Sequence, residues 1–557
     1  ITVFLAIGFM YCYGVMTGMS VSSIRAIMMF GFHVSSELCK RTYDMLTAMT
    51  IAAISILIEQ PLYLYHSGFL FSFGAILGIG LLAPAVEENG IGHLAPIVKE
   101  NGIGSRKIIK AIEANLAIAI AVFPVYLYFY YEYPLYSLFL NLLIIPGTVL
   151  LVSGGLLSVA GAAYRIFLGK CFALPIGGLL RLYEMCCMFF QQLPGNRSII
   201  GRPAMWQIAI FSFLICFTFI CCKRMTKIEF WMYILLAFLC ITIRFSDGLQ
   251  ITFLDVGQGD GIYLADGKGG HYLIDGGSSS KNELGEYQLV PFLKATGVDT
   301  LDVVFVTHLD DDHYNGIEYL LMEQEHNGIC IRRLILPALC ENCQDERYNA
   351  LEKKALQQNV VLQYMDNGDV IRHGNFKLTC LHPNGCKNNN ITTNKCEIAK
   401  DTTNDGTKNE QSLVLYLEYG NFTALFTGDL EGSGEEEVQK KLKEAGANLR
   451  RLTVLKVAHH GSRNSTSQTF LNLTRPEIAV ISCGENNRYG HPHAELLERL
   501  EAVGAKVMRT DEMGAIEMRV KDDVKVTVYK RTRSRMGYTR IFCLNGIGKW
   551  KECLDEK

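Results

Sequence analysis

Long apolar runs fill the first part of this chain, whereas the later part alternates short apolar runs with polar ones. A helix needs about 20 mostly apolar residues to cross a bilayer. By this measure we expect membrane spans at 1–19, 45–65, 68–84, 108–131, 135–160, 172–193, 205–222 and 228–244. The alternative is a very apolar soluble bundle, but the runs lack the polar faces that such a bundle presents to water. The pattern predicts a polytopic α-helical membrane domain over residues 1–245.

From residue 246 onward the pattern predicts a soluble α/β domain. Runs rich in β-branched residues predict strands at 249–254, 261–265, 271–275, 302–307, 333–337, 376–381, 412–418, 422–427, 452–457, 478–482, 504–509, 514–520 and 524–530. Helical periodicity predicts helices at 283–296, 313–324, 346–357, 433–445, 466–473 and 494–503. We expect a four-layer αββα sandwich over residues 246–530. A basic tail over 531–557 either attracts a polyanion or is simply solvated.

Charge is informative only locally, because the formal net charge of −2 averages two unlike halves. Lysine and arginine residues between the spans alternate onto one side, which the positive-inside rule assigns to the cytoplasm. The last span then leaves the cytoplasm, so we expect the soluble domain outside; Arg197 and Arg202 oppose this orientation. The chain begins at Ile1 inside an apolar run, and we expect it to lack an N-terminal portion.

Polar and helix-breaking residues interrupt the apolar part. Arg25 lies between apolar segments, where a charge must face protein, water or headgroups rather than lipid. Small and polar residues mix with aromatic ones from Pro61 to Ala75, and Asn141 and Pro146 repeat the pattern. Irregular backbone survives in a membrane only where protein buries it or where it lines a watery cavity. These features favour a channel or transporter over an anchor.

The densest chemistry follows the strand predicted at 302–307. Two imidazoles and three carboxylates stand within the six positions 308–313. Carboxylates so close repel one another unless a highly charged cation lies among them. His308 and Asp310 could hold a metal on one side, and Asp312 and His313 on the other, with ligands that suit Zn²⁺ or Mn²⁺. The alternative is a solvated acidic loop at a helix N-terminus.

Two later strand ends supply partners for this motif. Asp429 ends an apolar strand, where one oxygen on each metal could bridge a pair about 3.5–4 Å apart, although it could instead cap the next helix. His459 and His460 end another strand. Because adjacent side chains on a strand point opposite ways, we expect one histidine to bind metal and the other to orient it or contact substrate.

Two loops complete the candidate site. Arg488, Tyr489, His491 and His493 suit recognition of a phosphate and stacking of a base, although one histidine could merely cap the helix predicted from Ala494. In the glycine-rich loop 255–261, Asp255 suits a turn, whereas the role of Asp260 stays open. The turn that begins at Asp275 is expected to be structural.

Together these motifs resemble the ComEC family, polytopic proteins implicated in DNA uptake during natural transformation. In the apolar part the resemblance rests on Ser23-Ile24-Arg25-Ala26, on Pro61 to Ala75 and on Asn141 to Pro146. In the soluble part it rests on Asp-Val-Gly-Gln-Gly-Asp, His-x-Asp-x-Asp-His, Thr-Gly-Asp, His-His-Gly-Ser and Gly-His-Pro-His, in the order of the family. The resemblance implies a metallo-β-lactamase fold whose metal ligands are His308, Asp310, Asp312, His313, Asp429 and His460.

The resemblance also implies a function. The chain would be a multi-pass protein of the bacterial cell membrane that conducts single-stranded DNA, and its outer domain would be a metal-dependent phosphodiesterase that degrades the other strand. Two divalent ions, Mn²⁺ or Zn²⁺, would serve as cofactors. Expected partners are single-stranded DNA, membrane lipid, other competence-machinery proteins and a second copy of the chain. Catalysis would use Asp312 to bind metal and orient the nucleophile, and further residues to hold phosphate or protonate the leaving oxygen: Lys456, His459, Arg488, His491 and His493.

The sequence departs from the wider metallo-β-lactamase pattern. Most enzymes of that fold have histidine where Asp310 stands, and another before the Asp429 strand, where this chain has 409–412 and His382 as its nearest imidazole. Weaker nitrogen ligation makes Mn²⁺ as plausible as Zn²⁺. Two other functions stay open: a transporter whose soluble domain only binds or guides DNA, and a membrane-attached hydrolase of a lactam, thioester or other phosphodiester.

Overall fold

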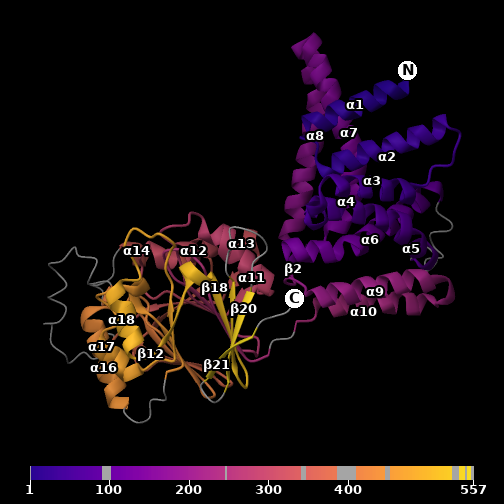
Figure 1. Cartoon of the computed structure of the whole chain (residues 1–557). Coiled ribbons are helices and arrows are strands. Elements are labelled where there is room, and N and C mark those ends of the chain that lie inside the picture. The colour runs from indigo at the N-terminus through magenta and orange to yellow at the C-terminus, as the bar shows by residue number, and fades with distance from the viewer. Residues whose placement is uncertain are drawn as a thin grey trace. The chain divides into compact units, whose positions relative to one another are not determined.

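The chain divides into two units, residues 1–243 and residues 244–557 apart from 294–297 (Figure 1). The structure is a computed structural model that describes residues 2–90, 102–244, 247–339, 346–384, 409–445, 452–529, 539–545 and 549–553. The first unit is helical apart from one short pair of strands, and the second is rich in sheet. The two units therefore correspond to the two composition regimes of the sequence.

A helix occupies each predicted span of the first unit. Its helices are α1 (Thr2–Met16), α2 (Val21–Leu38), α3 (Met45–Glu59), α4 (Ser67–Leu77), α5 (Ala83–Asn89), α6 (Gly102–Tyr130), α7 (Ser137–Tyr164), α8 (Ile166–Gln192), α9 (Met205–Cys221) and α10 (Lys227–Thr242). Among the described residues, five stretches are long and apolar enough to cross a membrane: Ser67–Asn89, Ile108–Tyr130, Ser137–Tyr164, Ile166–Gln192 and Met205–Arg224.

The three remaining predicted spans are occupied by shorter helices than expected. The span predicted at 228–244 corresponds to α10, which has 16 residues. Ala6–Met16 and Met45–Glu59 are apolar but fall below the spanning length. The first ends before Gly18, whose φ is +73°, and α3 ends just before Pro61, which disfavours helix in the residue ahead of it. Hydropathy had joined each helix to apolar residues beyond these breaks, so the predicted bounds 1–19 and 45–65 were too wide.

The backbone is irregular near both ends of the segment from Pro61 to Ala75, as the composition of this segment predicted. It begins as a 3₁₀ turn, Pro61–Tyr65, and α4 continues into a π turn, Gly78–Leu82. Gly78 contacts α6 so closely that an added Cβ would lie 2.8 Å from Ile118 Cα. A small residue is therefore required where these helices cross.

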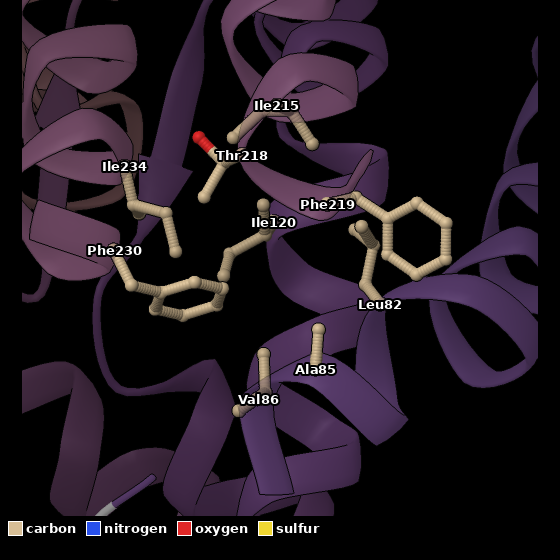
Figure 2. Close-up of a pocket in the computed structure, with 9 residues that line it drawn as sticks. All are labelled: Leu82, Ala85, Val86, Ile120, Ile215, Thr218, Phe219, Phe230 and Ile234. Carbon is tan, nitrogen blue, oxygen red and sulfur yellow. The ribbon is translucent and has the colours of Figure 1, made fainter. Parts of the chain in front are cut away.

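Helices α5, α6, α9 and α10 share an apolar core with a small cavity (Figure 2). The lining residues are Leu82, Ala85, Val86, Ile120, Ile215, Thr218, Phe219, Phe230 and Ile234. The hydroxyl of Thr218 donates to Leu214 O at 2.7 Å. The cavity thus offers apolar contact and no polar group that needs a ligand.

The second unit contains a ten-stranded and a seven-stranded sheet. The larger has the order β10-β9-β7-β5-β4-β3-β18-β19-β20-β21, and the smaller has the order β11-β12-β13-β14-β15-β16-β17. Their bounds are β3 (Leu249–Phe253), β4 (Gly261–Ala265), β5 (His271–Gly276), β7 (Val303–Phe305), β9 (Arg333–Pro337), β10 (Val361–Met365), β11 (Val370–His373), β12 (Phe376–His382), β13 (Val414–Tyr419), β14 (Phe422–Phe426), β15 (Val454–Lys456), β16 (Ile478–Ile481), β17 (Lys506–Arg509), β18 (Ala515–Val520), β19 (Val524–Tyr529), β20 (Thr539–Asn545) and β21 (Lys549–Cys553).

Every predicted strand is present, but the prediction missed several. Strands β10 and β11 are edge strands whose side chains are mostly exposed or half-buried, apart from Met365, so their sequence lacks the alternation that marks a strand. Strands β20 and β21 lie within residues 531–557, which were expected to be a basic tail. These two strands extend the ten-stranded sheet.

The apolar core lies between the two sheets, and helices cover their outer faces (Figure 1). Helices α11 (Val290–Thr296), α12 (Asp311–Met322) and α14 (Glu346–Gln357) cover the larger sheet. Helices α16 (Gly432–Ala445), α17 (Gln468–Thr474) and α18 (Ala494–Ala502) pack on the smaller one through a second apolar core. This arrangement confirms the predicted αββα sandwich.

Strand order brings the motifs together. β14, β15 and β16 are parallel neighbours in one sheet, as are β5, β7 and β9 in the other. Because parallel strands of one sheet end at the same edge, the residues that follow β14 and β15 emerge side by side. Residues that follow β7 in the other sheet lie next to them, since ligand atoms of His313 are within 4.8 Å of those of Asp429 and His460. The candidate site lies at these strand ends.

Candidate metal centre

Imidazoles and carboxylates from three strand ends converge on one buried place. Ligand atoms of His308, His313 and Asp429 lie within 4.8 Å of one another, and so do those of Asp312, His313 and His460. Asp429 Oδ2 is 3.2 Å from His313 Nε2 and 3.4 Å from His460 Nε2. His460 Nε2 is also 3.4 Å from Asp312 Oδ2. Five of the six predicted metal residues therefore share one site.

The sixth, Asp310, lies at the edge of the site. It is the N-cap residue of α12, and Asp311 and Asp312 follow in the first turn. Its Oδ2 is 3.7 Å from His308 Nε2, and its Oδ1 is 3.7 Å from the guanidinium of Arg347. The motif is thus both a helix N-terminus and part of the cluster, so the two alternatives for it are not exclusive.

The paired histidines lie beyond their strand, which corrects the geometry expected for them. They occupy a turn, Ala458–Gly461, with φ of 47° at His459 and 51° at His460. Consecutive left-handed residues other than glycine cost free energy and persist where the surroundings fix them. His460 donates from Nδ1 to Ser482 O at 2.9 Å, which turns its Nε2 toward Asp312 and Asp429. The turn, rather than strand alternation, separates the two rings.

His459 faces the site from its open side. Its Nδ1 lies 2.7 Å from Glu431 Oε1, and its Nε2 lies 3.8 Å from Asp429 Oδ2. Burial lowers its pKa, but Asp429 and Glu431 outweigh this and raise the pKa to about 9. Glu431 escaped the sequence analysis, although its place two residues after Asp429 is a signal that could have found it.

Asp275 has a more direct role than the structural turn expected for it. It is buried, with a φ of +55°, and accepts hydrogen bonds from Thr307 N at 2.8 Å and Thr307 Oγ1 at 2.7 Å. Its Oδ2 is 2.9 Å from His313 Nδ1. A carboxylate on one ring nitrogen fixes the other nitrogen as the free ligand atom. Asp275 therefore points His313 Nε2 into the site.

Asp429 presents a single oxygen to the cluster. Its Oδ2 faces the Nε2 atoms of His313 and His460, and lies 4.0 Å from His308 Nε2. Its Oδ1 instead lies 3.6 Å from Lys456 Nζ. The expected arrangement, with one oxygen for each metal, is not the one observed.

Lys456 is enclosed by the protein. Its side chain is 1% exposed, donates to Gly428 O at 2.9 Å and forms an ion pair with buried Asp260. It was expected to meet a phosphate, but its amine has no open face toward a substrate. The sequence left the role of Asp260 open, and the structure pairs it with Lys456.

The loop 486–493 lies beside the cluster. The rings of Tyr489 and His491 stack with centroids 5.7 Å apart, and the guanidinium of Arg488 lies 4.8 Å above the Tyr489 ring. His491 is 5.5 Å from His459, ring to ring. His493 is the N-cap residue of α18 and accepts from Arg463 N through Nδ1, so it holds the loop in place.

Most enzymes of the wider fold have a histidine before the Asp429 strand, and two residues of this chain could have taken its place. Asn409 is buried, and its amide nitrogen lies 3.5 Å from His459 Nδ1. His382 donates from Nε2 to Glu410 O at 2.9 Å and belongs to none of the clusters found among the described residues. Neither supplies a further imidazole to the site.

The donor set fits a divalent cation. Among the described residues, the Nε2 atoms of His308, His313 and His460 are buried without a hydrogen-bond partner. Orphaned polar atoms in a protein interior are costly unless something binds them. Burial and the neighbouring His313 lower the pKa of His308 to about 3, which leaves it neutral, as a metal ligand must be.

The carboxylates of the site create a strong negative field. Burial lowers the pKa of His313, but Asp429 and Asp275 raise it well above its ordinary value. Burial raises the pKa of Asp429, whereas the surrounding histidines hold it well below its usual range. A field that favours positive charge on a buried imidazole also favours a metal ion between the same carboxylates.

Comparison with known proteins matches both units. A family model described as "Competence protein" matches residues 1–225, and one described as "Metallo-beta-lactamase superfamily" matches residues 255–337. ComE operon protein 3 of Bacillus subtilis (strain 168) is 27% identical over 545 residues, 93% of this chain. Recombination protein 2 of Haemophilus influenzae is 24% identical over 581 residues, 96% of this chain. Competence protein ComA of Neisseria gonorrhoeae is 30% identical over 267 residues, 48% of this chain and 32% of the relative.

These similarities cover both units but only part of the relatives. The chain spans 63% of the Bacillus protein and 66% of the Haemophilus protein. The metallo-β-lactamase match includes the motif at 308–313, whereas Asp429 and His460 lie beyond its end. The competence match and the long apolar helices identify a membrane protein.

Proposed function

We propose, since this chain is a competence-family protein with a metallo-β-lactamase-superfamily domain, that it conducts single-stranded DNA across the cell membrane and hydrolyses DNA with its soluble domain. The metallo-β-lactamase fold suggests a metal-dependent hydrolase, and the attached membrane domain favours DNA as its substrate. The soluble domain would lie outside the cytoplasm and degrade the strand that does not enter.

One observation carries the hydrolytic part of this proposal. Buried imidazole and carboxylate atoms from three strand ends meet within 4.8 Å, and several of them lack any hydrogen-bond partner among the described residues. A divalent ion, Mn²⁺ or Zn²⁺, would satisfy these atoms at once. Among the described residues there are four such groups. Three of them include His313, and the fourth joins Asp260, Asp429 and His460. This overlap is compatible with a pair of ions.

The residues of the site would divide the work of phosphodiester hydrolysis. A divalent ion held here supplies Lewis acidity, which lowers the pKa of water and offsets charge on phosphate oxygens. Asp312 would hold the ion and orient the nucleophile. Glu431 fixes Nδ1 of His459, so that its Nε2 faces the site and would protonate the leaving oxygen.

Residues around the opening would bind the DNA. Arg488 is exposed next to Tyr489, a residue that is 45% exposed and whose ring stacks on His491. Such a platform suits a base above and a phosphate beside it. Arg347, which the sequence analysis missed, adds a guanidinium next to Asp310 and Asp311, at the N-terminus of α12. Arginine binds phosphate with a geometry that lysine cannot match.

Further partners follow from the membrane part. We propose that lipid surrounds the long apolar helices, because α7 and α8 expose most of their apolar side chains. Other competence proteins and a second copy of the chain are proposed partners on the family relationship.

The test is cleavage of a fluorescent single-stranded oligonucleotide by the full chain in detergent with Mn²⁺. We expect cleavage that EDTA abolishes and that Asp312→Ala reduces by at least about 100-fold. Asp311→Ala is a matched control, because Asp311 neighbours Asp312 in the first turn of α12 but has a side chain that is 69% exposed and outside the clusters.

Other results would favour the competing functions. Binding of the oligonucleotide without any cleavage, in Mn²⁺ and also when Zn²⁺ replaces it, would support a domain that only guides DNA. Cleavage that survives in Asp312→Ala would contradict the assigned site. Hydrolysis of a lactam or thioester with no action on DNA would identify a membrane-attached hydrolase of another substrate.

A further inference from the structure

Lys456 is an unusual residue to find inside a protein. Among the described residues it is the only buried lysine or arginine. Lys456 is the last residue of β15 and the register partner of Phe426 in β14. Phe426 lies three residues before Asp429. The alkyl chain of Lys456 therefore places its ammonium group next to the end of β14, which Asp429 follows.

Three groups surround the ammonium nitrogen. It donates to Gly428 O at 2.9 Å, forms an ion pair with Asp260 and lies 3.6 Å from Asp429 Oδ1. The backbone of Lys456 is bonded to the end of β14 as well, because Thr427 Oγ1 donates to Lys456 O at 2.7 Å. The two residues just before Asp429 are therefore bonded to Lys456, Gly428 through its carbonyl and Thr427 through its hydroxyl.

Asp260 links this charge to the other strand ends. Its side chain is 1% exposed, its N–H donates to Asp312 O at 3.0 Å, and its carbonyl accepts from Gly277 N at 2.9 Å. Its carboxylate lies 3.7 Å from His313 Nδ1 and 3.8 Å from His460 Nδ1. These are the ring nitrogens that face away from the cluster.

Stability alone does not explain the buried ion pair between Lys456 and Asp260. Replacing such a pair with apolar side chains of similar volume is often neutral or stabilising. The interior at this place therefore gains little stability from the charges themselves. What the lysine supplies is a fixed positive charge on the side of Asp429 that the histidines do not face.

We propose that Lys456, held by Asp260, is a positioning residue that keeps Asp429 turned with Oδ2 alone toward the metal site. This inference rests on the proposed metal-binding function and assigns Lys456 no contact with substrate. The ammonium group attracts Oδ1, so the carboxylate is not free to rotate and offer both oxygens to one ion. Preorganisation of a ligand by its supporting residues raises metal affinity, and losing such support typically costs about 10- to 100-fold.

The test measures metal affinity and folding separately. The full chain in detergent is titrated with Mn²⁺ and with Zn²⁺ by calorimetry, and its thermal unfolding is followed by circular dichroism. The main variant combines Lys456→Met with Asp260→Asn, because it removes both buried charges together. A second double variant, Lys456→Gln with Asp260→Asn, retains a donor for Gly428 O. Lys354→Met is the control, since it breaks a partly exposed ion pair between Lys354 of α14 and Glu318 of α12.

We expect the double variants to fold and to bind Mn²⁺ about 10-fold or more weakly than the wild-type chain, while Lys354→Met keeps the wild-type affinity. Wild-type affinity in a folded double variant, within about twofold, would overturn the positioning role. If the methionine variant does not fold, the glutamine variant decides. Absence of Mn²⁺ and Zn²⁺ binding by the wild-type chain would instead overturn the metal site, and with it this inference.

Discussion

Arg25 of α2 donates a hydrogen bond from Nε to Ser72 Oγ of α4 at 2.7 Å. The two residues belong to two separate stretches that carry the resemblance to competence proteins, and Ser72 is buried. The guanidinium therefore faces protein, which is one of the environments expected for a charge between apolar segments. The hydrogen bond to Ser72 does not fit the alternative, in which the guanidinium would contact only lipid headgroups.

Ser72→Ala should destabilise the helical unit, because it leaves a charged donor without its acceptor. Hydrogen bonds to charged groups contribute about 1.5–3 kcal/mol, so we expect a clear drop in the thermal midpoint in detergent. Ser55→Ala is the control, since Ser55 donates only to Ile51 O of its own helix. Equal midpoints for the two variants would mean that the bond to Arg25 contributes nothing.

Asp275→Asn should weaken metal binding without unfolding the soluble unit. The change replaces an oxygen that accepts from Thr307 and His313 with a donor, so His313 loses the group that fixes its tautomer. Supporting groups of this kind typically account for about 10- to 100-fold in metal affinity. Calorimetric titration with Mn²⁺ measures the effect.

Asp302→Asn provides the comparison for that experiment. Asp302 accepts hydrogen bonds from Arg332 and from His271 N, and it belongs to none of the clusters of the described residues. The same chemical change should therefore leave the Mn²⁺ dissociation constant unchanged. A loss of affinity in both variants would show a general effect of Asp→Asn on the fold.

Asp266 should make the stability of the soluble unit depend on pH in the acid range. Burial raises the pKa of this carboxyl, but hydrogen bonds from His373, Lys268 N and Gly270 N outweigh burial and lower the pKa. A lowered pKa stabilises the folded state fully above the unfolded pKa of about 3.9, and this stability is lost as pH falls through the folded pKa.

Thermal unfolding between pH 3 and pH 7 tests this effect of Asp266. Wild type should be more stable than Asp266→Asn at neutral pH, and the difference should shrink once the pH falls below about 4. A difference that stays constant over this range would mean that the carboxyl does not titrate with folding.

Tyr489→Ala should weaken binding of single-stranded DNA. Stacking of a base on an aromatic ring contributes about 1–3 kcal/mol, so the dissociation constant should rise about 5-fold or more. Fluorescence anisotropy of a labelled oligonucleotide in EDTA measures binding without cleavage. Tyr287→Ala serves as the control, since Tyr287 is also exposed but lies in the π turn before α11. An unchanged dissociation constant for Tyr489→Ala would mean that the Tyr489 ring does not stack on a base.

Much of the fold follows from local patterns. Strands such as β13 and β14 alternate or run apolar between clear turns, and their positions were predicted to within a few residues. The motif at 308–313 pointed to a cation because charge density is a local property of the sequence. The grouping of His308, Asp312 and Asp429 could be expected because each follows a strand.

The rest depended on contacts between distant parts of the chain. Nothing around Lys456 indicates whether its amine reaches solvent or turns inward, since that depends on Asp260, which lies in the loop before β4 of the other sheet. Asp275 read as a turn residue because its partners, Thr307 and His313, belong to the next strand end. The edge strands β10 and β11 lack a local signal, as all of their side chains except Met365 are exposed or half-buried.

The most direct test of the account is the amount of metal bound by the purified full chain. After dialysis against Mn²⁺ or Zn²⁺, elemental analysis should find at least one ion per chain, and Asp429→Ala should lose most of it, because Asp429 faces both His313 and His460. His382→Ala, which changes a buried imidazole outside the clusters of the described residues, should keep the wild-type content. A wild-type chain without metal, or an Asp429→Ala variant that binds as much as wild type, would contradict the account.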